Sequence, residues 1–325
     1  MAYTAGDTIL DDEYNNFLNE VDGVTEVYGI NHIMGTGAGA YGLGQTAISS
    51  VAAGNTITAA QWNSLFTGMD NVANHTNDTL TSTTARSAGD TIAIIAALRT
   101  DLDTLAASVA AGCPNATAIS TSAALQTATS STRWAGSHTV EQSVTFSNAN
   151  EARWFFNAGG KIQINVSRTG NGGSSATSKD SSVSELITGL GDFKFGSVAS
   201  TRSGSTETVT TNGLAIGFHD LTTSYQTVLR LTQNSGTYTS MYFDIQAKAN
   251  AAAGSATVVT IRTALVDPDA GDGTFTAGNT SGVDQYANFI GTTNVILKTV
   301  NPTTAEGLTT VYTPSSTAVA TNTTA

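Results

Sequence analysis

Several features that stabilise or target small proteins are scarce in this chain. Its 325 residues include one cysteine, Cys113, and four prolines. A single cysteine excludes an internal disulfide and any zinc site built from several thiolates. No apolar run approaches the length of a transmembrane helix, and the N-terminus lacks the basic and apolar regions of a secretion signal. We expect a chain made in a cytoplasm, without membrane insertion, that is held together by packing or oligomerisation.

Charge is also scarce. Only 12% of the residues are charged, and 13 basic against 25 acidic residues give a net charge of −12. A negative chain repels nucleic acid, so we expect no nucleic-acid partner. Small uncharged residues take the place of the charged ones, which is typical of strands and subunits that approach closely. The hydrophobic content of 40% still permits a sizeable core.

One phrase, Ala-Gly-Asx-Thr-Ile, occurs three times, at residues 5–9, 53–57 and 88–92. Repetition at such a period is typical of small units that cannot bury their apolar faces alone. The repeats therefore favour assembly, either between neighbouring units or between subunits.

Helices are predicted after the first two phrases, at about residues 11–22 and 59–72. Tyr14 and Trp62 occupy the same offset in the two copies, and apolar residues recur at helical spacing after each. Thr58 and Gln61 have the spacing of a capping box. Their apolar faces either pack within one domain or contact other subunits.

The third phrase leads into a predicted helix that continues to about residue 111. Its apolar residues alternate spacings of three and four, as in a short coiled coil. This predicted oligomerisation stripe comprises Ile95, Leu98, Leu102, Leu105 and Val109. The stripe either joins copies of the chain, with a trimer preferred, or packs on its own domain.

The remaining chain is predicted to be mainly β. Strict alternation at residues 161–166, 241–248 and 257–266 indicates strands, and residues 154–156 are interpreted as a strand followed by a turn at 157–160. A short helix is expected to be capped by Ser182 and Glu185.

These patterns divide the chain into four parts. Residues 1–110 form an α-containing attachment and oligomerisation region, and residues 111–133 form a linker. Residues 134–312 form an antiparallel β-sandwich, and residues 313–325 form a polar tail that is disordered or lies across a neighbouring subunit.

The glycine-rich loop at residues 37–42 has the spacing of a dinucleotide-binding fingerprint but lacks the strand, helix and acid that this fingerprint needs. Its glycines instead permit close approach of another surface. Together with large apolar side chains, they form a set of predicted docking residues. This set comprises Tyr14, Gly37, Gly39, Tyr41, Gly42, Trp62 and Phe66.

Catalytic patterns are weak, so we expect no enzyme, no metal and no cofactor. The carboxylates of Asp267, Asp269 and Asp272 gather as in a calcium loop, but the EF-hand spacing fails, and a hairpin turn explains them as well. The four histidines show no zinc spacing, and no nucleophile elbow occurs.

Two segments carry a resemblance to known proteins. Residues 35–45, with Ile57, Thr58, Trp62 and Leu65 after them, resemble a glycine-rich loop and helix of structural proteins from tailed bacteriophages, notably phages of aquatic bacteria and cyanobacteria. Residues 152–162 and 167–170 are similar to the opening of a β domain found in phage tail-fibre and appendage proteins.

The resemblance implies a structural component of a virion, an oligomeric tail or neck (collar) fibre. Its expected partners are copies of itself and other virion proteins of the tail, baseplate, neck or capsid. Residues 1–110 would dock on the particle, and residues 134–312 would project outward. The alternatives are an adhesin that recognises a glycan or protein receptor on the host cell, and a capsid decoration protein.

Overall fold

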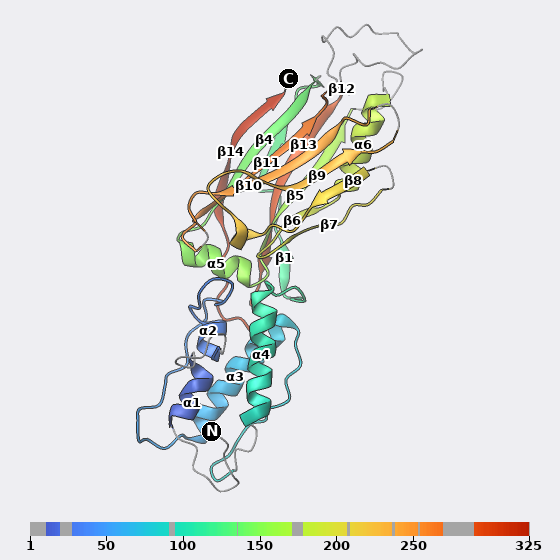
Figure 1. Ribbon diagram of the computed structural model, residues 1–325. Coiled ribbons are helices and arrows are strands. Elements are labelled where there is room, and N and C mark those ends of the chain that lie inside the picture. The colour runs from blue at the N-terminus through green and yellow to red at the C-terminus, as the bar shows by residue number, and fades with distance from the viewer. Residues whose placement is uncertain are drawn as a thin grey trace. The chain divides into compact units, whose positions relative to one another are not determined.

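The computed structural model describes residues 11–19, 28–90, 95–134, 136–170, 178–206, 209–235, 238–252, 254–268 and 289–324 (Figure 1). Helix and strand take up similar shares, 27% and 31%, so the chain is mixed rather than mainly β. It divides into two compact units. The N-terminal unit comprises Met1–Ser120, Arg153–Gly160 and Asn301–Thr313, and the β unit comprises Thr121–Ala152, Lys161–Val300 and Pro314–Ala325.

The N-terminal unit contains the predicted helices. They are α1 (Asp11–Leu18), α3 (Ala59–Thr76) and α4 (Ile95–Ala110), joined by an unpredicted short helix, α2 (Ile30–Met34). The capping box that starts α3 is confirmed: Gln61 N–H donates to Thr58 Oγ1 over 3.3 Å, and Thr58 N–H donates to Gln61 Oε1 over 2.8 Å. Asn77 ends α3 in a left-handed conformation, with φ of 60°.

The repeated phrase corresponds to a repeated hydrogen-bonding device. Asn15 of α1 donates to Val51 O and accepts from Val51 N, both over 2.9 Å. Asn63 of α3, at the same offset, donates to Arg86 O over 3.0 Å and accepts from Arg86 N over 2.8 Å. Val51 and Arg86 each lie two residues before the next phrase. Each helix therefore holds the chain segment that leads to the following repeat.

The glycines of the second and third phrases share a conformation. Gly54 and Gly89 have φ of 80° and 94°, a left-handed turn that suits glycine. The equivalent aromatic residues of the first two repeats touch, because the Tyr14 and Trp62 rings meet edge to face with centroids 5.2 Å apart. The first two repeats thus share one core within the N-terminal unit.

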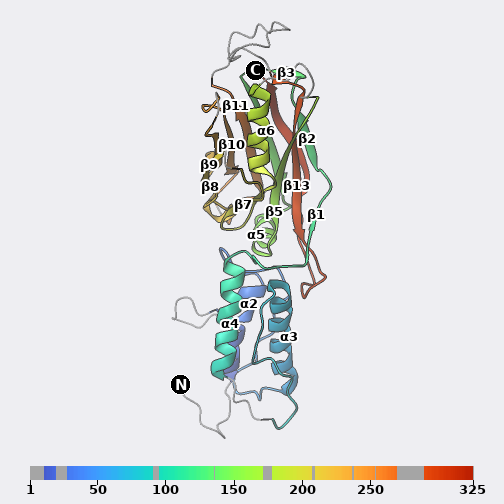
Figure 2. The ribbon, with the colours of Figure 1, turned by 90° about the vertical axis from the view of Figure 1, so that its right-hand side faces the viewer.

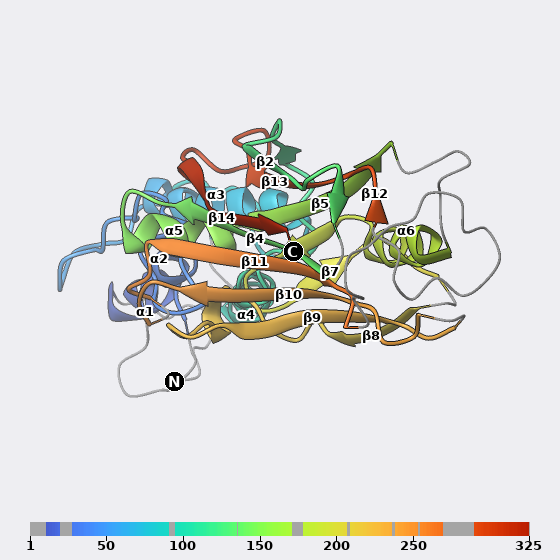
Figure 3. The same cartoon turned by 90° about the horizontal axis from the view of Figure 1, so that it is seen from above.

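The β unit contains two six-stranded antiparallel sheets (Figure 3). In the first, the order is β1-β13-β5-β6-β7, and β2 also pairs with β13. Its strands are β1 (Ile119–Thr121), β2 (Gln126–Thr129), β5 (Lys161–Thr169), β6 (Phe193–Phe195), β7 (Ser200–Arg202) and β13 (Thr292–Pro302).

In the second sheet the order is β14-β4-β11-β10-β9-β8. Its strands are β4 (Ser137–Thr145), β8 (Val209–Gly213), β9 (Gln226–Gln233), β10 (Tyr242–Ala249), β11 (Val258–Val266) and β14 (Ser315–Thr324). A separate pair joins β3 (Arg133–Trp134) to β12 (Phe289–Ile290). The strands predicted at 161–166, 241–248 and 257–266 are confirmed as β5, β10 and β11.

Helix α6 (Ser178–Leu190) contacts β9 of one sheet and β5 of the other (Figure 2). The short helix predicted here is confirmed, but its predicted cap is wrong, because Ser182 and Glu185 both lie inside α6, which begins at Ser178. A 3₁₀ turn, η1 (Phe218–Asp220), precedes β9.

The strand predicted at residues 154–156 is wrong, because these residues belong to helix α5 (Ala149–Asn157). Asn148 caps this helix: its Oδ1 accepts from Glu151 N over 3.0 Å, and its Nδ2 donates to Glu151 Oε1. The predicted turn at 157–160 is the end of the helix, where Gly159 has φ of 86° and Gly160 N–H donates to Phe155 O over 2.9 Å.

The predicted linker and tail both contain strands. Within residues 111–133, β1 and β2 join the first sheet, where Gln126 to Thr129 pair with β13. Within residues 313–325, β14 pairs with β4 of its own chain. Sequence periodicity missed both because short Ser, Thr and Ala side chains do not distinguish the two faces of an edge strand.

No helix in the described part of the chain is both long enough and apolar enough to cross a bilayer.

We predict that Asn63→Ala lowers the free energy of unfolding by about 1 to 3 kcal/mol, because both backbone groups of half-buried Arg86 lose their partner. Urea denaturation measures the change. Ser64→Ala, at the exposed next position of α3, is the control and is expected to stay within about 0.5 kcal/mol of wild type. Equal effects of the two substitutions would contradict the repeated device.

Candidate functional site

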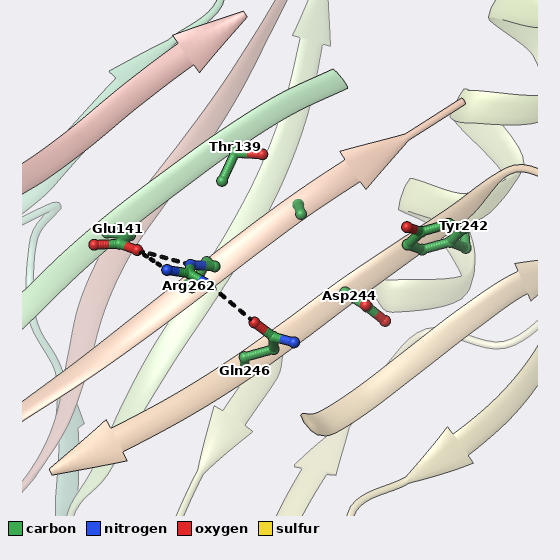
Figure 4. A pocket seen from close by; sticks show the side chains of 7 residues that line it. Thr139, Glu141, Tyr242, Asp244, Gln246 and Arg262 are labelled. Carbon is green, nitrogen blue, oxygen red and sulfur yellow. Dashed lines mark hydrogen bonds and ion pairs between the residues drawn. The ribbon is translucent and has the colours of Figure 1, made fainter. Parts of the chain in front are cut away.

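A polar hollow of about 300 Å³ lies on the face of the second sheet, over β4, β11 and β10 (Figure 4). Its lining combines carboxylates, a guanidinium, an amide, a hydroxyl and one aromatic ring. The lining residues are Thr139, Glu141, Tyr242, Asp244, Gln246, Arg262 and Ala264.

Strand register explains why the hollow forms at this point. Ala264 pairs with Thr139 on one side and with Asp244 on the other. Its neighbours on the same face of β11 are Arg262 and Val266, since side chains alternate along a strand. The small side chain of Ala264 between larger ones leaves the face hollowed.

The first charged group of the site is built around Arg262. Its register partners are Glu141 and Gln246. The guanidinium donates to Glu141 Oε1 from Nε over 2.7 Å and also from Nη2, and to Gln246 Oε1 from Nη1 over 3.4 Å. Its carbon lies 3.8 Å from the centroid of the Tyr225 ring, over which Lys248 also lies. The arginine is therefore fixed by an ion pair and by an aromatic face.

A second arginine–carboxylate pair lies beside another aromatic ring, as the first pair does. Arg230 of β9 forms a two-pronged ion pair with Asp244: Nε donates to Oδ1 over 2.6 Å and Nη2 donates to Oδ2. The guanidinium carbon lies 4.4 Å from the centroid of the Tyr242 ring. The Asp244 carboxylate is 8% exposed, whereas Arg230 is 44% exposed. The hollow thus presents fixed planar groups along its rim.

The electrostatics favour recognition over acid catalysis. Burial acts to raise the pKa of Glu141, but the hydrogen bonds and charges around it, those of Arg262 above all, outweigh burial and lower the pKa. Glu141 is therefore an ionised acceptor at neutral pH, not a proton donor. Burial raises the pKa of Tyr225 to about 12, so its hydroxyl stays protonated. Each of the two arginine–carboxylate pairs has a net charge of zero.

Sequence reasoning missed this site. Glu141 and Arg262 are far apart in the chain, and no spacing joins them. The available signal was the outward position of each residue in an alternating strand, but only the strand register brings them together.

The predicted docking loop at residues 35–45 is bound within its own unit. Arg153 donates to the carbonyl oxygens of Thr36 and Tyr41. Asn157 Nδ2 donates to Tyr41 O over 2.8 Å and to Gly42 O over 3.1 Å, with a longer bond of 3.3 Å to Gly39 O. Arg153 is 5% exposed and Asn157 is fully buried. The surface that the loop approaches is therefore the last turn of α5.

The same loop also holds a later segment of the chain. Gln45 Nε2 donates to Thr310 O, and Gln45 Oε1 accepts from Thr309 N, both over 2.8 Å. Tyr312 Oη donates to Gly44 O over 3.1 Å. Residues from three distant parts of the sequence therefore meet at this loop.

The apolar docking candidates lie in the core of the N-terminal unit. Tyr14 is fully buried, and Trp62 and Phe66 are 3% and 2% exposed. Tyr41 is half-buried, and its ring packs at a tilt against the rings of Tyr28 and His32. These residues already have partners within the chain, so their apolar area does not indicate a docking surface.

The predicted oligomerisation stripe is also covered within one chain. Leu98, Leu102, Leu105 and Val109 are fully buried, and α4 packs on α3 and α2. Ile95 is half-buried at the edge of the same core. Packing on its own domain thus accounts for the stripe, and any contact between copies must use another surface.

The predicted calcium loop is described only in part. Asp267 forms a buried ion pair with Lys179, while Asp269 and Asp272 lie outside the described residues. Within the described ranges, no group of three or more His, Cys, Asp or Glu side chains is placed to hold a metal ion.

Comparison with protein-family models, with curated proteins and with solved structures finds no match to this chain.

We predict that Gly37→Ala destabilises the protein far more than Gly39→Ala. Both glycines have positive φ, 46° and 55°, so alanine costs each about 1 kcal/mol. A Cβ at Gly37 would lie 2.4 Å from Gly42 N, whereas a Cβ at Gly39 meets nothing within 4 Å. Displacing the loop also leaves buried donors of α5 unpaired, which adds about 1 to 3 kcal/mol.

Urea denaturation midpoints measure the difference. Gly39→Ala is the matched control for the cost of positive φ in the same loop. Equal midpoints for the two variants would show that close approach of the loop to its own chain does not stabilise the fold.

Proposed function

We propose that this protein is a structural component of a tailed-bacteriophage virion, an oligomeric tail or collar fibre. One observation carries the proposal. The two segments that resemble phage structural proteins, residues 35–45 and 152–162, form two sides of one buried hydrogen-bonded contact, through Arg153 and Asn157. The two segments that carry the resemblance therefore belong to one structural module of this protein.

We further propose that the two antiparallel sheets form a β-sandwich that projects from the particle. The second sheet has one buried and one outward face: along β4 and β11, buried and half-buried residues alternate strictly. Such a module is typical of a rigid extracellular domain.

The attachment region is extended relative to residues 1–110. Residues 153–160 and 301–313 belong to the same compact unit, and side chains of both segments donate to the loop at 35–45. Removal of residues 1–110 would strip Arg153 and Asn157 of their acceptors, so a deletion is a poor test of which end attaches. A trimer remains our preferred assembly, with its interface outside the stripe of α4.

The test uses purified particles of a phage that encodes the chain. We expect mass spectrometry of the particles to detect the protein at the level of other appendage proteins. Immunogold labelling should mark a tail or collar appendage, and mass photometry of the purified protein should give three copies. Label on the head would support the decoration alternative, and particles without the protein would overturn a virion role.

A second candidate function, recognition of a host-cell sugar, is favoured by the hollow on the second sheet. Its two arginine–carboxylate pairs offer fixed donors and acceptors with balanced charge, and Tyr242 adds an aromatic ring beside them. A neutral, hydroxyl-rich ligand uses such groups without breaking their ion pairs. The volume of about 300 Å³ is at the lower end for ligand pockets, which suits one or two sugar rings.

We predict that Ala264→Tyr, which fills the hollow, abolishes binding of the full-length protein to neutral glycans on an array. Val258→Tyr is the matched control, because it places the same side chain on the same face of β11, outside the lining residues. Binding that both variants retain, or that both lose, would reject the hollow as the site. Wild-type protein that binds no neutral glycan would reject the second function alone.

A further inference from the structure

Two ion pairs are buried side by side at the start of α6. Lys179 Nζ contacts Asp267 Oδ2, and both side chains are fully buried. The next residue, Asp180, pairs with Arg168 over 2.6 Å, and these side chains are 2% and 3% exposed. Asp267 directly follows β11, so the first pair joins a helix to a strand that lies far along the sequence.

The surroundings of the Lys179–Asp267 pair are aromatic and closed to solvent. Lys179 Nζ lies 5.3 Å from the ring centroid of Phe289 and 5.7 Å from that of Tyr238. Trp134 packs at a tilt against Phe289, with ring centroids 4.1 Å apart. All three aromatic residues are buried, at 3% exposure or less. The faces of these aromatic rings stabilise a cation, but they replace little of the hydration that both charges lose on burial.

Lysine and arginine differ in what they can do in this setting. The Arg168 guanidinium makes several fixed hydrogen bonds, to Asp180 and to Ile290 O. It has no nucleophilic nitrogen at ordinary pH, so this pair stays ionic. The Lys179 amine is a nucleophile once it loses a proton, and its reaction partner is held against it. Fixed contact of two reacting groups replaces a bimolecular encounter and accelerates their reaction greatly.

We propose that Lys179 and Asp267 become joined by an intramolecular isopeptide bond. A proton passes from Nζ to the Asp267 carboxylate, which converts the ion pair into a neutral amine and a carboxylic acid. Nζ then attacks Cγ. The Nζ–Cγ bond forms, one Cγ–O bond breaks, and that oxygen leaves as water with two of the original ammonium protons. No oxidant, reductant or co-reactant is needed, and the product carries no buried charge.

This bond ties α6 to the end of β11 and closes residues 179–267 into a covalent loop. The loop contains strands β6 to β11, so most of the second sheet would be held by the linkage. A chain with one cysteine has no disulfide to do this. The inference stands on the buried pair alone and is independent of the proposed virion role.

The experiment measures the intact mass of the full-length protein after purification and denaturation. We expect wild type to be lighter than its sequence by the mass of one water. Lys179→Arg, which keeps the positive charge but not the reactive amine, should have its full mass. The difference between the mass deficits of wild type and variant cancels any removal of the first methionine, because both proteins share it.

Peptide mapping of wild type gives a second readout that does not depend on the folding of a variant. Tryptic digestion should yield one branched peptide that contains both Lys179 and Asp267, and no cleavage after Lys179. A wild-type mass equal to the full sequence mass, with Lys179 and Asp267 in separate peptides, would overturn the proposal and leave a buried ion pair. A mass loss that peptide mapping assigns to other residues would overturn it equally.

Discussion

The N-terminal unit depends on the hydrogen bonds that Arg153 and Asn157 donate to the glycine-rich loop. Both donors are buried, and an unpaired buried donor costs about 1 to 3 kcal/mol. The carbonyl groups of Thr36, Tyr41 and Gly42 can all point toward α5 only because the chain turns sharply between them, through glycines in left-handed conformations. The glycine-rich pattern therefore records close approach, as its sequence indicates, but the approaching surface is the chain itself.

Local signals in the sequence predicted local structure well. The capping box at Thr58 placed the start of α3, and strict alternation located β10 and β11. The error at α5 came from weighing a run of aromatic residues above the helix N-cap signal at Asn148, whose Oδ1 accepts from Glu151 N. A helix buried on most of its surface has the same composition as a buried strand, so only its caps distinguish the two.

The candidate site could not be predicted in the same way. Whether Glu141 faces outward is readable from alternation, but whether it meets Arg262 depends on the register between β4 and β11. A shift of one residue would turn every side chain of β11 to the opposite face. That register is fixed by core residues such as Ile261 and Leu265 on the buried face. Core packing therefore brings the residues of the site together, and no sequence motif encodes them.

Because charged residues are scarce in this chain, the places where they gather are informative. With 12% of residues charged, a random surface of this chain consists mostly of small polar side chains, yet two arginines and two carboxylates line or rim a single hollow. Solubility does not require this arrangement, because scattered charges serve it as well. The arginines of the two pairs are 44% and 35% exposed, and ion pairs open to solvent on one side add little stability, about 0 to 1 kcal/mol each. The concentration of fixed, paired charges beside Tyr242 therefore supports the proposed recognition of a ligand, whereas the pairs buried at α6 belong to the fold.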